Sequence, residues 1–213
     1  PFLKALDCAS LVIAIPSDED DVLARDALYA DTEMETLLQK TKAVFVRGGA
    51  TRQSSVKIAL EKTAEKITDG IVLIHDAARP FVTEEIIVRT AQAAIEHGAA
   101  VPAVLPTDTQ KIINAEGFIL EHLKRERMAA VQTPQAFDLM RLLASHRKAE
   151  NDGKAYTDDT EIWGKYEGDV MTVQGSPDNK KITYTEDIRM TAFRTGLGYD
   201  MHRLIPGRKL IIG

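Results

Sequence analysis

The segment HDAARP, residues 75–80, places a carboxylate and an arginine three residues apart, directly after an apolar run. At the end of a buried strand, Asp76 is placed to hold a divalent cation between phosphates. Arg79 could bind a phosphate in the same cleft, because a guanidinium forms charge-assisted hydrogen bonds with phosphate oxygens. The same two side chains could instead form an internal ion pair that only shapes the loop. The spacing therefore indicates either a cation and phosphate site or a structural pair.

A second polar segment, RGGATRQSS at residues 47–55, also follows an apolar run. Its paired glycines would let the backbone approach a ligand closely. Arg52 offers a forked donor for a phosphate or a base edge. Ser54 and Ser55 fall where a helix would begin, which favours anions. The segment is not a Walker loop, because no G-K-[ST] follows. The alternative interpretation is a tight turn with a solvated arginine.

Other polar residues have simpler interpretations when taken alone. Lys181 begins a predicted strand, where a lone lysine is usually solvated. The TDD segment, residues 157–159, most simply caps the helix that holds Trp163. Trp163 is more typical of core packing than of base stacking, and His75 is more typical of a structural histidine than of a base. Residue type and spacing alone assign no chemistry to this group.

The elements that must position these segments are short strands that alternate with helices. The buried-strand candidates are the apolar runs 11–15, 43–46, 71–74 and 99–105. Apolar spacing and cap residues predict helices over 18–30, from Ser54 to 67, and from Thr83 to Gly98. This alternation predicts an α/β fold with a mostly parallel sheet. Ligands of such sheets bind beyond the carboxyl ends of the strands, so the loops that follow the strands rank first.

The pattern changes after Pro106. Residues 109–123, TQKIINAEGFILEHL, are typical of two short strands around Glu116-Gly117, which predicts a β-hairpin that projects from the sheet or pairs with a neighbour. The remaining predictions are an amphipathic helix over 136–149, strands over 169–173 and 181–184, and a short helix from Thr185.

Composition limits the class of protein. The chain has 213 residues, 44% of them hydrophobic and 28% charged, with a formal net charge of −5. These values fit one globular domain, or one domain and a fragment. The acidic balance argues against binding to nucleic acid or to an anionic membrane, which needs a basic face. Cys8, the single cysteine, suits a reducing cytoplasm. No apolar run approaches the roughly 20 residues that span a bilayer.

Six segments occur in an order and at separations typical of one enzyme family: GGATRQSSV, HDAARP, TDTQK, QTPQAF, TDD and DNKKIT. Together they resemble the 2-C-methyl-D-erythritol 4-phosphate cytidylyltransferase family over residues 10–193. The end of the chain, TGLGYDMHRLIPGRKLIIG, resembles the start of a 2-C-methyl-D-erythritol 2,4-cyclodiphosphate synthase, a lyase that some bacteria fuse to the first enzyme. The resemblance implies a cytidylyltransferase domain over 1–193 and the first strands of a synthase domain over 194–213.

The fold implied by this resemblance is a Rossmann-like nucleotidyltransferase sheet with a projecting hairpin arm used for dimerisation. The implied reaction is in-line transfer of CMP from CTP to methylerythritol phosphate, with loss of pyrophosphate, in non-mevalonate isoprenoid biosynthesis. Catalysis would rest on positioning and on charge neutralisation by Mg²⁺, arginine and lysine. Two alternatives stay open: a related ribitol-phosphate cytidylyltransferase, and a fragment that binds ligand or dimerises without turnover.

The resemblance also implies roles for single residues. Asp76 matches the aspartate that binds the catalytic Mg²⁺, and Lys181 the lysine that binds phosphate near the transferring centre, so both are expected to be catalytic. Besides Asp76, the positions that match the nucleotide site are Gly48, Gly49, Arg52 and Ser55. Besides Lys181, the positions that match the methylerythritol phosphate site are Arg79, Thr109, Arg125, Thr133 and Thr157. In the family, the hairpin arm delivers an arginine to the partner subunit, which implies a homodimer with Arg125, or Arg127 two residues on, in that role.

The match departs from the family at both ends. The family begins with a strand and a Gly-rich loop that wraps the triphosphate, and no such loop stands in the 213 residues, so we expect them to turn over CTP poorly as written. At the other end, Asp200 and His202 match two metal ligands, usually for Zn²⁺, of the synthase. Their i, i+2 spacing puts both on one face of a strand, but a third ligand is missing. We therefore expect that metal site to be incomplete.

Overall fold

The computed structural model describes residues 1–15, 26, 29–30, 32–41, 43–184 and 187. The chain divides into two compact units, Pro1–Lys181 and Ile182–Gly213, and the fold described below is that of the first. Its strands are β1 (Val12–Ile15), β2 (Val44–Arg47), β3 (Ile71–Ile74), β4 (Ala99–Val104), β5 (Lys111–Ile113), β6 (Ile119–His122), β7 (Ala130–Val131), β8 (Gln135–Asp138) and β9 (Met171–Gln174). Its helices are α1 (Phe2–Ala5), α3 (Thr32–Lys40), α4 (Arg52–Ala64), α5 (Glu84–His97), α6 (Leu139–Asn151) and α7 (Asp159–Tyr166), with a 3-10 helix at Arg125–Arg127.

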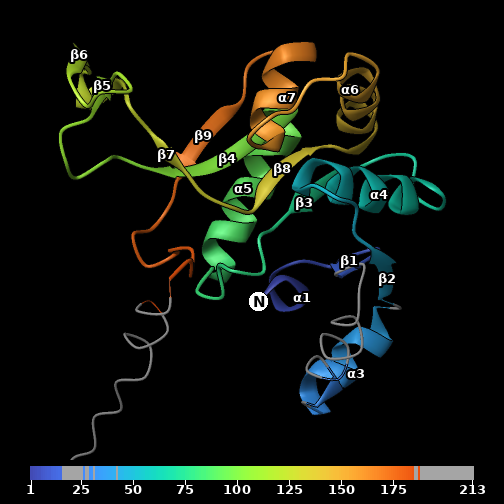
Figure 1. The fold of residues 1–213 in the computed structure, drawn as a ribbon. Coiled ribbons are helices and arrows are strands. Elements are labelled where there is room, and N and C mark those ends of the chain that lie inside the picture. Colours follow the sequence, from blue (N-terminus) through green and yellow to red (C-terminus); the bar gives the residue numbers. More distant parts are fainter. Residues whose placement is uncertain (16–25, 27–28, 31, 42, 185–186, 188–213) are drawn as a thin grey trace, which may run out of the picture. The chain divides into compact units, whose positions relative to one another are not determined.

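Most strands of the larger sheet point the same way. In the five-stranded sheet, β8 pairs with both β3 and β4, while β7 and β9 also pair with β4 (Figure 1). Because β8 runs antiparallel to both β3 and β4, and β9 parallel to β4, the strands β3, β4 and β9 are mutually parallel and β7 and β8 are reversed. Strands β1 and β2 form a separate parallel pair. The prediction of an α/β fold with a mostly parallel sheet is confirmed.

A tight apolar core fixes the part of the sheet that carries the candidate site. Phe137 on β8 packs against Trp163 on α7 with ring centroids 5.5 Å apart. Leu60 on α4 and Leu142 on α6 are buried in the same cluster. Burying a side chain of this size contributes about 1.5–3 kcal/mol, so α4, α6 and α7 are held firmly against β8. Trp163 is therefore a core residue, as predicted from the sequence.

Helix ends follow the polar residues that flank them. The helix α5 begins at its predicted cap Thr83 and ends at Gly98, which adopts a left-handed conformation with φ 83°. The prediction that Ser54 caps α4 is wrong. Thr51 is the cap: its side chain accepts a hydrogen bond from the Ser54 backbone N–H, while the Ser54 hydroxyl accepts one from the Thr51 N–H. This reciprocal capping box moves the helix start three residues earlier.

Two other predictions need correction, and one helix has no counterpart among the predictions. Residues 136–138 are not helical, because β8 spans Gln135–Asp138 and pairs with β3, so the helix starts only at Leu139. Residues 181–184 form no strand. The helix α3 (Thr32–Lys40) was not anticipated. The helix predicted over 18–30 lies mostly, and the one starting at Thr185 almost entirely, outside the described residues.

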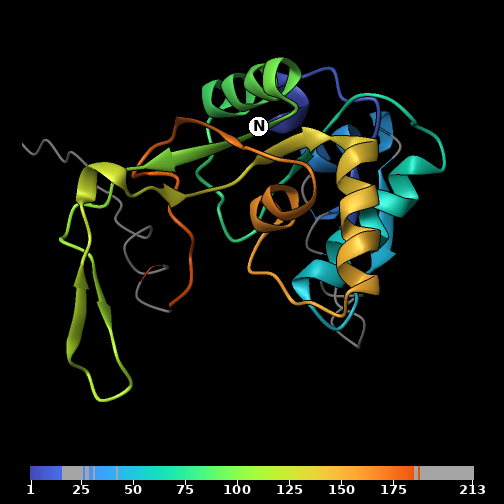
Figure 2. The same cartoon turned by 90° about the horizontal axis from the view of Figure 1, so that it is seen from above.

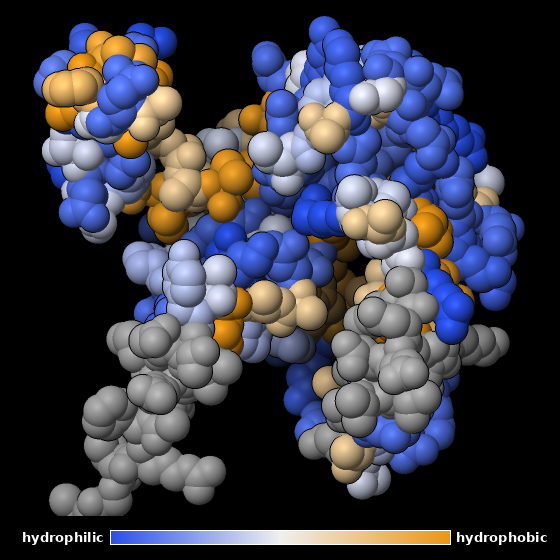
Figure 3. Space-filling model, viewed as in Figure 1, coloured by the Kyte–Doolittle hydropathy of each residue, from blue (hydrophilic) through white to orange (hydrophobic). Residues whose placement is uncertain are grey.

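The strands β5 and β6 form a two-stranded antiparallel sheet of their own, with Lys111 opposite His122. Figures 1 and 2 both show this hairpin standing away from the five-stranded sheet. It exposes apolar side chains: Phe118 is 72% exposed and Leu120 65%, and Figure 3 shows hydrophobic patches on it among polar ones. The use of this hairpin as a dimerisation arm stays a prediction. Within the described residues, no helix is both long and apolar enough to cross a membrane.

Candidate functional site

Three cationic side chains meet around the carboxylate of Asp76, which directly follows β3. Lys181 Nζ lies 3.2 Å and Arg79 Nε 4.0 Å from Asp76 Oδ2, and Arg52 Nε lies 3.5 Å from Oδ1. Burial raises the pKa of Asp76, but the charges of Arg52 and Lys181 outweigh it and hold the pKa below the carboxyl's ordinary value. The carboxylate is therefore kept ionised in a strongly basic setting.

The loop of residues 75–80 is shaped by its own backbone and by His75. The Arg79 N–H donates to the Asp76 carbonyl at 2.9 Å. His75 Nε2 donates to the Arg79 carbonyl at 3.0 Å, and its Nδ1 accepts from the hydroxyl of Thr133, which in turn accepts from the Asp76 N–H. Burial lowers the pKa of His75. Because these bonds shape the loop, the distant Asp76–Arg79 pair is not required for that purpose.

The segment between β2 and α4 has no space for side chains at its glycines. A Cβ on Gly48 would lie 2.9 Å from Ser55 Oγ, and one on Gly49 2.3 Å from Ser54 Oγ. The Ser55 hydroxyl accepts a hydrogen bond from the Gly49 N–H at 3.0 Å. This packing brings Arg52, in the first turn of α4, up to Asp76. The structure therefore shows a tight turn at these glycines, and the use of the segment as a ligand loop stays a prediction.

Arg52 also contacts a residue whose burial the sequence did not reveal. Its Nη1 lies 2.8 Å from Oδ2 of Asp159, a fully buried carboxylate at the start of α7. Burial lowers the pKa of Arg52, but the charge of Asp159 outweighs it and the pKa is raised. The TDD segment was interpreted as a cap, and Asp158 is indeed the cap. A cap needs only one acidic residue, so the presence of a second one directly after Asp158 is the sequence signal that could have identified Asp159.

The segment that brings Lys181 to Asp76 is clamped by two buried amides. The Gln132 side chain donates to the Ser176 carbonyl at 2.7 Å and accepts from the Ser176 N–H at 3.3 Å. Asn179 Nδ2 donates to the Thr133 carbonyl at 2.9 Å. Arg79 Nη1 donates to the Asn179 carbonyl at 2.8 Å. These bonds place residues 176–181 beside the loop of Asp76.

Other residues with expected roles lie apart from this cluster. Thr109 is exposed on the chain that leads to the hairpin, and Arg125 donates to the Thr107 carbonyl at 3.0 Å. Thr157 donates through both its N–H and its hydroxyl to the Glu161 carboxylate at 2.8 Å. Within the part of the chain that the structure describes, none of the three forms a hydrogen bond or ion pair with Asp76, Arg79 or Lys181. Asp200 and His202 lie outside the described residues.

The charges suit an anion accompanied by a cation. Three positive groups, Arg52, Arg79 and Lys181, face two carboxylates, Asp76 and Asp159, so the cluster carries a net charge of +1 in a chain of net charge −5. Within the described part of the chain, no three His, Cys, Asp or Glu side chains group as metal ligands. Mg²⁺ is commonly held by one or two carboxylates together with substrate phosphates. Asp76 fits that arrangement and does not by itself make a metal site.

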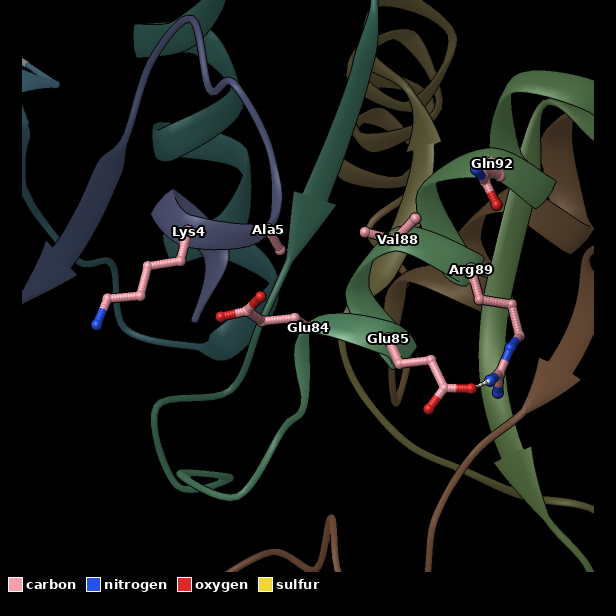
Figure 4. A pocket seen from close by; sticks show the side chains of 7 residues that line it. All are labelled: Lys4, Ala5, Glu84, Glu85, Val88, Arg89 and Gln92. Atoms are coloured by element: carbon pink, nitrogen blue, oxygen red, sulfur yellow. Dashed lines mark hydrogen bonds and ion pairs between the residues drawn. The ribbon is translucent and has the colours of Figure 1, made fainter.

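A separate open cavity of about 420 Å³ lies between α1 and α5 (Figure 4). Lys4 and Ala5 line it from α1, and Glu85 and Arg89 from α5. Glu85 and Arg89 pair with each other. No residue with an expected role in the sequence lines this cavity, so it is not part of the Asp76 cluster.

Comparison with known proteins gives a consistent result. The sequence model of the family 2-C-methyl-D-erythritol 4-phosphate cytidylyltransferase matches residues 8–195. A protein of Rhodopseudomonas palustris (strain BisB5) named "Bifunctional enzyme IspD/IspF" is 48% identical over 168 residues, which are 74% of this chain and 42% of that protein. A protein of the same name from Desulforudis audaxviator (strain MP104C) is 39% identical over 217 residues, 98% of this chain and 52% of that protein.

Solved structures agree with the sequence match. The chain resembles a 4-diphosphocytidyl-2C-methyl-D-erythritol synthase from Anaerococcus prevotii DSM 20548 with a TM-score of 0.70 and 30% identity, over 85% of this chain and 75% of that one. The chain spans about half the length of the curated relatives that it matches.

Proposed function

The chain belongs to the 2-C-methyl-D-erythritol 4-phosphate cytidylyltransferase family, and we propose that it transfers the CMP group of CTP to 2-C-methyl-D-erythritol 4-phosphate in non-mevalonate isoprenoid biosynthesis. A phosphate oxygen of the acceptor attacks the α-phosphorus of CTP, the bond from that phosphorus to the β-phosphate bridge breaks, and pyrophosphate leaves. The observation that best supports this reaction is the meeting of Arg52, Arg79 and Lys181 around Asp76.

The two cations nearest Asp76 Oδ2 are suited to bind phosphate. Arg79 is held by the Asn179 carbonyl, and burial lowers its pKa, so an anion nearby would stabilise its charge. Lys181 is 47% exposed and can turn from Asp76 to a phosphate. The step needs no nucleophile from the protein, because the acceptor's phosphate oxygen is the nucleophile. The catalytic contribution is positioning and neutralisation of charge in the transition state.

Asp76 would hold Mg²⁺ together with the phosphates of CTP. The bound ion would supply positive charge to the phosphate oxygens that become more negative as pyrophosphate leaves. The carboxylate has the required charge because its pKa is held low.

The loop of Gly48, Gly49 and Ser55 would accommodate the nucleotide. Its glycines bring the backbone close to any ligand in front of α4, and Arg52 supplies a forked donor. Thr133 supports the Asp76 loop through its hydroxyl, and its role toward the substrate is part of the proposal.

The acceptor side of the site would include Thr109 and Thr157, with Arg125 delivered from a partner subunit. This arrangement requires a homodimer in which the hairpin of β5 and β6 packs against a second copy. The exposed apolar side chains of the hairpin, Phe118 and Leu120 among them, support such an interface.

We propose further that residues 194–213 open a cyclodiphosphate synthase domain, since the curated relatives are named bifunctional. Asp200 and His202 would then be metal ligands, for Zn²⁺, in a site that needs residues beyond these. A cytoplasmic location is consistent with the single cysteine, Cys8, which is free.

The test is pyrophosphate release by the full-length protein with CTP, Mg²⁺ and 2-C-methyl-D-erythritol 4-phosphate. We expect turnover in the wild type and at least a 100-fold lower kcat in Asp76→Asn, in line with the loss of one preorganised charge. Glu116→Gln, in the exposed hairpin turn, is the matched control for loss of one carboxylate. Ribitol 5-phosphate as the better acceptor would contradict the assigned substrate, and no pyrophosphate release with either acceptor would contradict the activity.

A further inference from the structure

Behind Arg52 lies a buried polar chain that the proposed reaction does not by itself explain. Asp159 Oδ2 accepts from Arg52 Nη1 at 2.8 Å, and Asp159 Oδ1 accepts from His146 Nε2 at 2.9 Å. The side chains of Asp159 and His146 are both 0% exposed. This series of hydrogen bonds therefore links His146 on α6, through Asp159 at the start of α7, to Arg52 in the first turn of α4.

Helix capping does not account for Asp159. Asp158 already caps α7, because its side chain accepts from the Glu161 N–H at 2.9 Å. A carboxylate removed from water is costly unless it is paired and hydrogen-bonded. Both oxygens of Asp159 have such partners, so the burial is tolerated because Arg52 and His146 are there.

His146 determines which way Asp159 faces. Its Nδ1 is buried without a hydrogen-bond partner in the described residues. Nε2 therefore carries a proton, which is donated to Asp159 Oδ1. With Oδ1 fixed by His146 on α6, Oδ2 is left to face Arg52.

Arg52 lies between two carboxylates and is closer to the buried one. Its Nη1 is 2.8 Å from Asp159, whereas its Nε is 3.5 Å from Asp76. Without Asp159, the guanidinium would be drawn to Asp76 alone and would neutralise the carboxylate that faces the ligand. We propose that Asp159 and His146 are positioning residues that hold Arg52 for the nucleotide and keep it from closing onto Asp76. This inference rests on the proposed function, which makes CTP the ligand.

The test compares the wild type with Asp159→Asn, His146→Leu and His146→Gln in the full-length protein. Asn removes the charge at nearly constant volume, Leu removes the donor, and Gln keeps an N–H near the place of Nε2. We expect Asp159→Asn and His146→Leu to raise the KM for CTP and its dissociation constant by calorimetry about 10-fold or more, as the loss of supporting residues does around other sites. The KM for methylerythritol phosphate should change less than about twofold, and His146→Gln should restore CTP binding to within about threefold of the wild type.

A double-mutant cycle separates positioning from mere stability. Asp159→Asn should add no further loss of CTP affinity in an Arg52→Ala background, because the arginine it positions is gone. Asp138→Ala, which removes the cap of the helix that carries His146, is the control and should lower Tm while leaving the KM for CTP unchanged.

The inference is overturned if Asp159→Asn and His146→Leu lower Tm but leave CTP affinity within about twofold, as Asp138→Ala does. It is also overturned if Asp159→Asn weakens CTP equally with and without Arg52. Should the Asn variant fail to fold, the pair His146→Leu and His146→Gln decides the matter by the same affinities. A wild-type protein that binds CTP but transfers no CMP would overturn the proposed function alone, since CTP affinity still tests the positioning.

Discussion

The Asp76 cluster and the β5–β6 hairpin depart from the usual distribution of side chains in opposite directions. In the cluster, charged side chains are largely buried: the side chain of Asp76 is 18% exposed and that of Asp159 is fully buried. On the hairpin, apolar side chains such as Phe118 and Leu120 face outward. Buried charges and exposed apolar patches are the informative exceptions in a folded chain. We propose a different kind of partner for each exception, a small charged ligand for the cluster and a second subunit for the hairpin.

The two regions also differ in what holds them. The cluster joins residues far apart in the chain, with Arg52 from α4, Asp76 after β3 and Lys181 after β9. Its geometry therefore depends on the apolar core that packs α4 and α7 against β8. The hairpin depends on its own cross-strand pairing, with Lys111 opposite His122. Substitutions in the cluster should therefore change catalysis and ligand binding without changing the oligomeric state. Substitutions on the hairpin should change the oligomeric state without unfolding the subunit.

The largest effect is expected from the neighbouring lysines of the DNKKIT segment. Lys181→Met removes the cation 3.2 Å from Asp76, whereas Lys180 has no such contact in the described residues. We expect Lys181→Met to lower kcat by 10²–10³, or about 2.7–4 kcal/mol in the barrier. Lys180→Met is the matched control and should retain wild-type kcat, and both should keep the wild-type oligomeric state. Equal loss in the two variants, measured by pyrophosphate release, would show that the segment contributes only general positive charge.

The next effect concerns assembly. Ile113 and Ile119 face each other across the hairpin and are 60% and 54% exposed. Burial of an isoleucine contributes about 1.5–3 kcal/mol, so the double variant Ile113→Asp/Ile119→Asp should weaken a dimer by at least 100-fold. Analytical ultracentrifugation measures the dissociation constant, and Glu121→Gln on the same hairpin is the control. An unchanged sedimentation coefficient with an unchanged Tm would contradict the hairpin as an interface.

Local signals explain why much of the fold could be predicted from the sequence. The apolar runs that became β1, β2, β3 and β4 are short and end at polar or glycine-containing segments, so each strand is visible within a few residues. Strand β8 was missed because Ala136 and Phe137 also fit the apolar face of the helix that follows. Its strand character comes from pairing with β3, about 60 residues earlier, which no local pattern records.

Part of the candidate cluster could be predicted from the sequence, and part could not. The segments that contain Arg52 and Asp76 are placed by strand ends, and Lys181 was identified only through the family resemblance, since a lone lysine carries no local signal. Asp159 and His146 were not predicted as site residues, because each is ordinary in its own helix and only tertiary packing joins them to Arg52. Thr109 and Arg125 lie apart from the cluster in a single subunit, so their roles at the site stay predictions from the family resemblance.

A smaller effect should come from the cap that shapes the nucleotide loop. Thr51→Ala removes the side chain that accepts from the Ser54 N–H, and loss of such a cap costs about 1 kcal/mol. Thr51→Ser keeps the hydroxyl and should keep the stability. Urea unfolding measures both free energies. A loss in Thr51→Ala no greater than in Thr51→Ser would mean that the tight packing at Gly48 and Gly49 holds the loop without the cap.

The smallest effect is the pH dependence of the Asp76 ion pairs. The pKa of Asp76 is lower in the folded chain than its ordinary value of 3.8. A carboxyl of this kind contributes stability that is complete above its unfolded pKa and is lost as pH falls through its folded pKa. The difference in unfolding free energy between wild type and Asp76→Asn, on the order of 1 kcal/mol, should therefore stay constant from pH 7 to about pH 5 and shrink below about pH 4. Chemical denaturation across that range measures it, with Glu121→Gln as the control for loss of one charge. A difference that grows on acidification would mean that burial outweighs the charges of Arg52 and Lys181 and raises the pKa of Asp76. The buried cluster would then not be held by its ion pairs, in contrast to what we infer here.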